Sequence, residues 1–161
     1  MYRWIVFVHI LAALAFFMVH GASMVMAFRL RHEREMERIR AILDLSNAAL
    51  PAAYMALLVL LLAGIVAGIM GHWFSQGWIW TALVLMVVLW FGMHYYAFRF
   101  YTPIRKAVGL PYSDGKDHPA EPPAAEPDIA AAIQASNPAL LLGLSAVLVA
   151  VILWLMMFKP F

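Results

Sequence analysis

Residues 78–100 read WIWTALVLMVVLWFGMHYYAFRF, and Arg99 is the only charged residue among them. An apolar stretch of this length meets the ~20 residues that an α-helix needs to cross the hydrocarbon core of a bilayer. Three further stretches are similarly long and apolar, at residues 3–28, 50–71 and 138–158. We therefore predict an all-α fold, an integral membrane four-helix bundle that forms a single domain over residues 1–161.

The composition agrees with immersion in lipid. Hydrophobic residues make up 65% of the chain and charged residues only 12%, with a mean hydropathy of +0.83. Soluble domains average ~25% charged residues, because charge solvates their surface. The net charge of +2 comes from basic residues beside apolar stretches, so we expect no nucleic-acid partner. The absence of cysteine excludes disulfides, thiolate nucleophiles and Cys-ligated metal centres.

The positions of the basic residues predict how the chain crosses the membrane. Nine of the eleven lysines and arginines flank the apolar stretches on one side of the predicted bundle: Arg29, Arg31, Arg34, Arg38, Arg40, Arg99, Arg105, Lys106 and Lys116. Only Arg3 and Lys159 fall on the other side. Because cytoplasmic connections carry an excess of lysine and arginine, we predict that both long connections are cytoplasmic and that the N-terminus and the C-terminus are both outside. A bacterial plasma membrane, with its lipid bilayer as the first partner, fits this topology.

The two long connections, residues 29–49 and 101–137, differ in composition. Residues 28–47 read FRLRHEREMERIRAILDLSN, with apolar residues at helical spacing. This pattern predicts an extension of the first helix or a short helix at the membrane surface. Residues 101–137 hold six of the nine prolines, and we predict a flexible loop there. The pair Asn137-Pro138 then provides a capping residue and a proline at the first helical position, which is typical of a helix start.

The chemistry of the apolar stretches depends on histidine. These stretches contain no aspartate or glutamate, but they hold His9, His20 and His94, with His72 at the outer edge. A histidine in hydrocarbon is unfavourable unless its ring nitrogens have partners, so each one requires a hydrogen bond or a ligand. Imidazole is a usual axial ligand of haem iron and a common copper ligand. The four histidines are therefore candidate ligands, His72 the weakest, and a structural role for each stays open.

The spacing of these histidines along the helices predicts which of them can bind the same cofactor. His9 and His20 lie eleven residues apart, so they return to one helix face, roughly 16 Å apart along the axis. Measured from the midpoints of their stretches, His20 and His94 lie at the same depth, which predicts that they ligate one haem from opposite sides. Measured from the arginines that follow each stretch, the same two residues differ by about 6 Å in depth. His9 lies toward the outer side with His72, and a second site there is the corresponding hypothesis.

Three stretches, within about the first hundred residues, resemble the CopD-like membrane superfamily, which includes copper-resistance D proteins, uncharacterised four-helix proteins and the bacterial haem-binding protoporphyrinogen oxidases. Residues 4–9 read WIVFVH, residues 36–65 read MERIRAILDLSNAALPAAYMALLVLLLAGI, and the third apolar stretch has a tryptophan near its start and a histidine-tyrosine run near its end. The chain is most similar to the uncharacterised four-helix branch. The resemblance implies that His9 is a haem ligand and that His94 matches a later histidine of the family. Trp80 and Thr81 stand where the oxidases have a lysine, so protoporphyrinogen oxidation itself is not implied.

These observations give three functional hypotheses. The first is a b-type haem protein in electron transfer or membrane redox chemistry, with a quinone or a redox protein as its partner. Whether such a protein is an oxidoreductase in its own right stays open. The second hypothesis is a CopD-like copper permease. The third is a non-catalytic subunit of a larger membrane complex, or a chain that works as a homo-oligomer. The lack of carboxylates in the apolar stretches argues against a proton pump.

Overall fold

The computed structural model describes residues 1–161 and is almost entirely helical. Its four long helices are α1 (Tyr2–His32), α2 (Met36–Met70), α3 (Gly77–Tyr96) and α6 (Pro138–Phe158). The shorter elements are η1 (Trp73–Ser75), η2 (Ala97–Tyr101), α4 (Thr102–Ala107), β1 (Tyr112–Ser113), β2 (Asp117–His118) and α5 (Glu126–Ala135). Four helical segments are long and apolar enough to cross a membrane. The all-α fold is therefore confirmed, with four helices of the length and apolar character expected for a multi-pass membrane protein.

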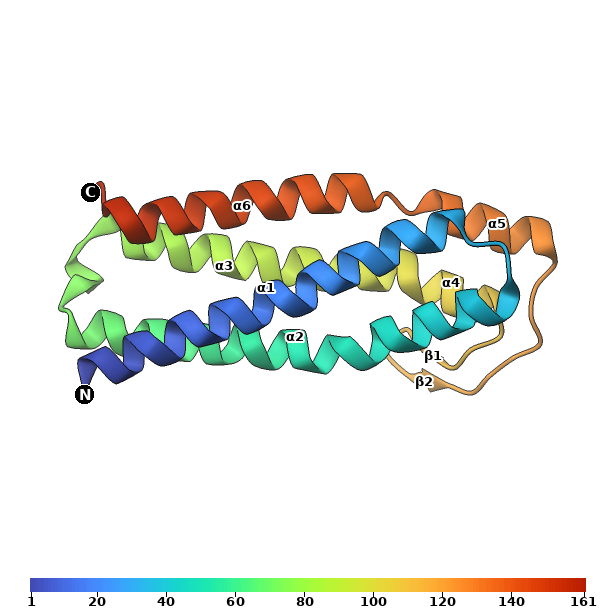
Figure 1. The fold of residues 1–161 in the computed structure, drawn as a ribbon, viewed down its shortest axis with the longest axis horizontal. Helices are drawn as coiled ribbons and strands as arrows, with labels where there is room; N and C mark the ends of the chain where they lie inside the picture. Colours follow the sequence, from blue (N-terminus) through green and yellow to red (C-terminus); the bar gives the residue numbers. More distant parts are fainter.

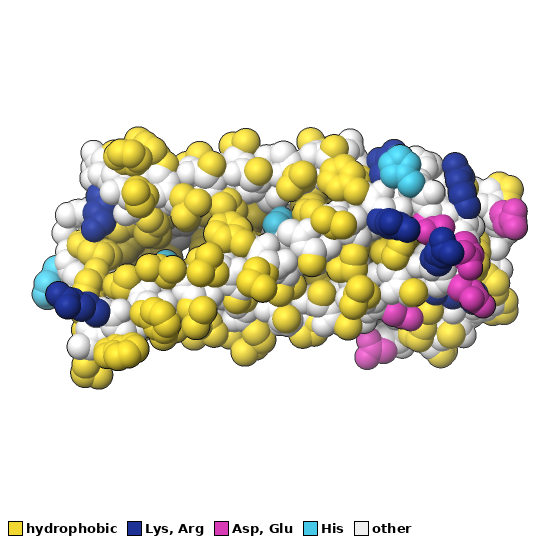
Figure 2. Space-filling model, in the orientation of Figure 1, with side chains coloured by type: hydrophobic (Ala, Val, Ile, Leu, Met, Phe, Trp, Pro, Cys, Tyr) yellow, Lys and Arg dark blue, Asp and Glu magenta, His cyan; other side chains and the backbone are white.

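The helices lie side by side, and both chain termini lie at one end of the bundle (Figure 1). There the ring of Tyr2 packs edge-on against Trp73, and the Trp78 N–H donates to the carbonyl of Phe161. We call this the terminal end. Most charged side chains gather at the opposite end (Figure 2), which residues 29–40 and 99–137 form. We call this second region the basic end.

The bundle is built from two helix pairs. Helix α1 packs along α2 and α3 packs along α6, whereas contacts between the two pairs are fewer. In the middle of the bundle, Phe16, Leu57, Met86 and Leu89 form a buried cluster that joins the pairs. The buried cluster at the terminal end contains Trp78, Ile79, Ala82 and Leu155, which all come from α3 and α6. The surface is accordingly hollowed between α6 and α1 toward the terminal end (Figure 2).

The basic end is folded, and helix α1 continues beyond its apolar stretch to His32, which was one of the two alternatives predicted for residues 29–49. Residues 36–49 form the first turns of α2, and residues 101–137 contain α4, a two-stranded hairpin and α5. A second hydrophobic core holds these parts together, made of Leu30, Ile39, Leu43, Ile104, Val108, Ile129 and Ile133. Residues 101–137 therefore contain helices and a hairpin where a flexible loop was predicted, and residues 29–49 belong to α1 and α2 and form no separate surface helix.

The positions of the prolines explain why the composition of residues 101–137 misled. Pro127 lies in the first turn of α5, where the missing N–H of proline costs no helical hydrogen bond. Pro103 lies in α4, which continues the helix of α3 through the π-helical turn η2. Gly109 and Gly115 have positive φ angles of 78° and 108°, a backbone region that glycine adopts without steric cost. At Asn137, the predicted cap is present, because its side chain accepts a hydrogen bond from the Leu140 N–H.

Candidate functional site

His9 lies on α1 in the terminal half of the bundle, with its ring against α2. A Cβ atom placed on Gly64 would lie 2.9 Å from His9 Cε1, so the ring occupies the space that any larger residue at position 64 would fill. His9 Nδ1 lies 2.9 Å from the carbonyl oxygen of Leu60. In a regular α-helix that carbonyl also accepts the N–H of Gly64. Gly64 and Leu60 therefore fix both the position and the orientation of the imidazole.

The hydrogen bond determines which nitrogen of His9 carries the proton. A carbonyl oxygen only accepts, so Nδ1 is the donor, and in the neutral ring Nε2 keeps its lone pair. Nε2 makes no hydrogen bond within the chain. A histidine that binds a metal normally donates its other ring N–H to a carbonyl or carboxylate, which fixes the tautomer in the same way. His9 is thus held in the form that a metal ligand requires.

His20 lies eleven residues further along α1 and is bonded differently. The Ser145 hydroxyl on α6 donates to the Leu142 carbonyl at 3.1 Å. Its oxygen is therefore left to accept from His20 Nε2–H, at 3.2 Å, because serine has a single hydroxyl proton. The imidazole also stacks on Phe16, with ring centroids 5.3 Å apart and an interplanar angle of 17°. His20 joins α1 to α6, and only Nδ1 lacks a partner within the chain.

A cavity lies beside His20 on the side of the basic end. It has a volume of about 70 Å³ and opens between α1, α2 and the segment from α3 to α4. Its polar lining residues are His20, Ser23, Ser46, Asn47, Tyr96, Tyr101 and Arg105. We call it the His20 cavity. The remaining lining residues are apolar, among them Met24 and Met93.

The other two candidate histidines do not join these sites. His94 is exposed and does not line the His20 cavity. It lies about 140° around α3 from the buried Leu89, at ~100° per residue, so it faces away from the bundle interior. The structure therefore does not bring His20 and His94 together, because Tyr96 rather than His94 faces the cavity. His72 is exposed in the turn before η1, with a positive φ of 55°.

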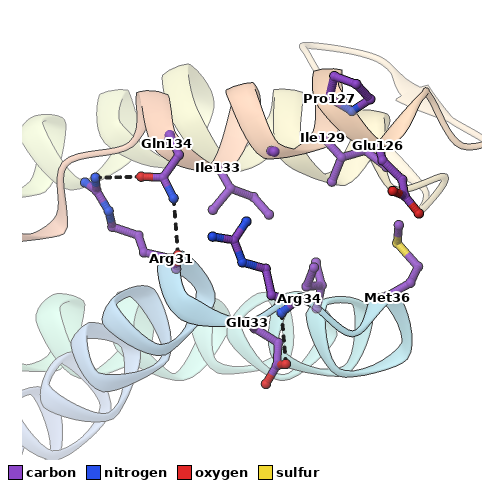
Figure 3. Close-up of a pocket in the computed structure, with 11 residues that line it drawn as sticks. Arg31, Glu33, Arg34, Met36, Glu126, Pro127, Ile129, Ile133 and Gln134 are labelled. Carbon is purple, nitrogen blue, oxygen red and sulfur yellow. Dashed lines mark hydrogen bonds between the residues drawn. The ribbon is translucent and has the colours of Figure 1, made fainter.

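A larger and more open groove lies at the basic end, between α5 and the turn from α1 to α2 (Figure 3). Its volume is about 510 Å³. At one end Arg31 donates to the side chain of Gln134 at 2.9 Å and to the Ser136 carbonyl at 2.5 Å. Arg34 points into the groove without an ion pair (Figure 3). Backbone N–H groups of Arg34 and Glu35 donate to the carboxylate of Glu33 and lower the pKa of that group.

The donor set decides which cofactors fit. No group of three or more His, Asp or Glu side chains is close enough to hold a metal ion. A bare copper or zinc site made by this chain alone is therefore not supported. A haem needs less from the protein, because its porphyrin supplies four nitrogen ligands and one histidine can hold the iron. His9 fits that requirement in protonation state, because its Nδ1–H donates to the Leu60 carbonyl.

Three residues of these sites were not predicted as functional: Gly64, Ser145 and Tyr96. Gly64 carries a sequence signal, since Gly64 and Gly68 are spaced for close helix contact, and Gly64 lies against His9. Ser145 and Tyr96 carry none, because their roles depend on which helices become neighbours. In comparisons with known proteins, no family model, no curated protein and no solved structure matches this chain.

Proposed function

We propose that this chain is a b-type haem protein of the bacterial plasma membrane, with His9 Nε2 as the axial ligand. The observation that carries the proposal is the hydrogen bond from His9 Nδ1 to the Leu60 carbonyl. It leaves Nε2 unprotonated and holds the ring in place against Gly64. The resemblance of residues 4–9 to the CopD-like superfamily supports the same residue.

Haem is favoured over a copper permease by the number of ligands. A copper path would need several nitrogen or sulfur ligands grouped at each site, and the chain has no such group of His, Asp or Glu and no cysteine. His9 is the one intramembrane histidine in which a hydrogen bond from Nδ1 leaves Nε2 unprotonated and without a partner. His20 uses its Nε2 to bind Ser145, and His94 is exposed.

The residues around His9 would orient and tune the cofactor. The Leu60 carbonyl raises the electron density on the imidazole through the Nδ1–H bond. Apolar side chains around the hollow would exclude water, and a dry, uncharged shell influences the reduction potential. When bound, the haem would supply one-electron chemistry. A quinone or the membrane segment of a redox protein could reach it from the bilayer, because the hollow opens sideways between α6 and α1 (Figure 2).

The test is the visible spectrum of the full chain, expressed with haem supplied and purified in detergent. We expect a Soret band that shifts on reduction with dithionite. One histidine ligand predicts a broad, high-spin reduced spectrum, whereas two histidine ligands from neighbouring chains would give sharp α and β bands. The variant His94→Ala should keep the wild-type spectrum, because His94 faces away from the bundle interior. A folded wild-type chain with no Soret band would overturn the proposal.

A further inference from the structure

The last turns of α1 carry an open groove on one face of the helix. The groove has a volume of about 470 Å³ and is lined by Val25, Phe28, Arg29, His32 and Glu33. The first four are spaced by three, four and seven residues from Val25, which places them on one face of a helix, and Glu33 directly follows the last helical residue. These four side chains are exposed, so the face points away from the packed interior. We call it the α1 groove.

The α1 groove crosses the boundary between the hydrocarbon core and the lipid headgroups. Phe16 belongs to the buried cluster in the middle of the bundle, and Arg29 follows it by thirteen residues, which is about 20 Å along the helix axis. Half a hydrocarbon core is about 15 Å thick, and half a bilayer with its headgroups is about 21 Å thick. Arg29 therefore lies in the headgroup layer, whereas Val25 lies beside the acyl chains. Along the bundle, the apolar surface accordingly gives way to charged side chains at this end (Figure 2).

The polar groups of the α1 groove are free to bind a ligand. The three ion pairs of the chain lie elsewhere, so the side chains of Arg29 and His32 form none. Glu33 accepts hydrogen bonds from the N–H groups of Arg34 and Glu35, at 3.0 and 3.3 Å, through Oε1 alone. Its second oxygen, Oε2, is left without a partner. From the lipid outward, the groove thus presents an apolar surface, two N–H donors and then a carboxylate oxygen.

This order of chemical groups matches one class of membrane lipid. A lipid phosphate accepts hydrogen bonds from a guanidinium group, often two at once, and such charge-assisted bonds are strong. The carboxylate of Glu33, one helical turn beyond Arg29, complements a headgroup that carries a primary ammonium. It gains no ion pair from the hydroxyls of phosphatidylglycerol, which has a net negative charge. The quaternary ammonium of phosphatidylcholine has no N–H to donate.

We propose that the α1 groove binds a phospholipid with an ethanolamine headgroup. The lipid phosphate accepts hydrogen bonds from Arg29 and His32, and the ammonium donates to Glu33 Oε2. One acyl chain lies along Val25 and Phe28. This inference does not depend on the proposed haem, because the haem ligand lies in the terminal half of the bundle.

The test is native mass spectrometry of the full chain in detergent micelles that contain equal amounts of three phospholipids. Phosphatidylethanolamine, phosphatidylglycerol and phosphatidylcholine are used with identical acyl chains. We expect the first bound lipid to be phosphatidylethanolamine, in roughly fivefold excess over each of the others, as suits one additional ion pair at a surface. Equal occupancy by the three lipids would overturn the proposal. Glycerophosphoethanolamine, which lacks acyl chains, should not displace the lipid at equal concentration, and displacement would contradict the role of Val25 and Phe28.

Two variants with matched controls test the assigned roles in the same lipid mixture. Glu33→Gln keeps an oxygen for the backbone N–H groups but loses the charge, so the preference for phosphatidylethanolamine should disappear while binding of phosphatidylglycerol rises. Arg29→Gln should lower the occupancy of all three lipids. The controls Glu37→Gln and Arg38→Gln change exposed residues of the basic end that do not line the groove, and they should behave like the wild type. An unchanged preference in Glu33→Gln, or the same loss in Glu37→Gln, would contradict the assignment.

Discussion

The basic half and the terminal half of the bundle differ in how completely their side chains fill the interior. The basic half has a complete core that includes Leu43, Ile104 and Val108, all with no exposed surface. Arginine side chains add bonds to backbone carbonyls there, such as Arg40 to Val108 at 2.9 Å. In the terminal half the buried cluster belongs to α3 and α6 alone, and a hollow separates those helices from α1 (Figure 2). Side chains of the chain itself fill the basic half, whereas the terminal half keeps the hollow in which we propose that haem binds.

This difference separates the part of the bundle that holds the helices together from the part that we propose binds the cofactor. In water, burial of apolar surface stabilises a core directly. Within lipid the same side chains gain little from leaving the solvent, so helices associate through packing and hydrogen bonds. The basic end therefore fixes the positions of the helices, and the terminal half can stay open around His9. The following predictions test that division, from the largest expected effect to the smallest.

The largest effect is expected from Leu43→Ala in the core of the basic end. Leu43 has no exposed surface, so its truncation removes both burial and packing and should lower the free energy of unfolding by about 3 kcal/mol. The control Leu62→Ala removes a side chain that is 54% exposed to lipid, and we expect a change below about 1 kcal/mol. Unfolding of both variants in lipid nanodiscs, followed by tryptophan fluorescence, measures the difference. Equal losses would show that the two halves are not distinct.

A smaller loss is expected from Arg105→Met. Arg105 donates to the carbonyls of Leu43 and Pro111 at 3.1 and 2.8 Å, and to the Asp44 carboxylate at 3.0 Å. Removing these charge-assisted bonds should cost about 2 kcal/mol, with little from Asp44 itself because that side chain is exposed. Arg105→Lys should restore only part of the loss, since an ammonium group cannot reproduce the fork of a guanidinium. Full recovery in the lysine variant would indicate that charge alone matters.

In the terminal half, Gly64→Ala should act on the cofactor more than on the fold. The new methyl group would lie 2.9 Å from His9 Cε1, so the ring must move. Overpacking of this kind costs ~1–3 kcal/mol, and we expect haem affinity to fall by roughly tenfold. Titration of haem into the purified chain measures it. Gly21→Ala is the control, because no atom lies within 4 Å of a Cβ at that position. Unchanged affinity in Gly64→Ala would argue against His9 as the ligand.

The smallest effect is expected from Ser145→Ala, which removes the partner of His20 on α6. Hydrogen bonds between membrane helices contribute about 0.6 kcal/mol on average, so the free energy of unfolding should fall by an amount of that size. Haem binding should not change, because the His20–Ser145 contact joins α1 to α6 and takes no part in the proposed site at His9. A loss of haem without a loss of stability would move the cofactor site from His9 to His20.

The sequence is enough to predict the four spans, because the length of an apolar stretch depends only on local composition. It also gives the cap at Asn137, since Ser136-Asn137-Pro138 precedes an apolar run. The fold of residues 101–137 could not be predicted from composition. A core forms there only when α4 and α5 pack against the start of α2, which brings together Ile104, Val108, Ile129 and Ile133. No local sequence pattern indicates this packing.

The histidines show the same limit. His9, His20 and His94 are visible as intramembrane histidines, and the common face of His9 and His20 follows from helix geometry. The direction in which the His94 side chain points could not be predicted in this way, because it depends on which side of α3 packs against the neighbouring helices. The tautomers of His9 and His20 depend on Leu60 and Ser145, which lie on other helices. Spacing along one helix therefore identified the candidates but could not separate a ligand from a structural link.

The most direct test of the central claim is a haem titration of three full-length proteins, the wild type, His9→Ala and His20→Ala, each first shown to be folded by circular dichroism. The account predicts that the wild type and His20→Ala bind haem with similar affinity and that His9→Ala does not bind it. Retention of haem by His9→Ala, or its loss from folded His20→Ala, would contradict the assignment of His9 as the axial ligand.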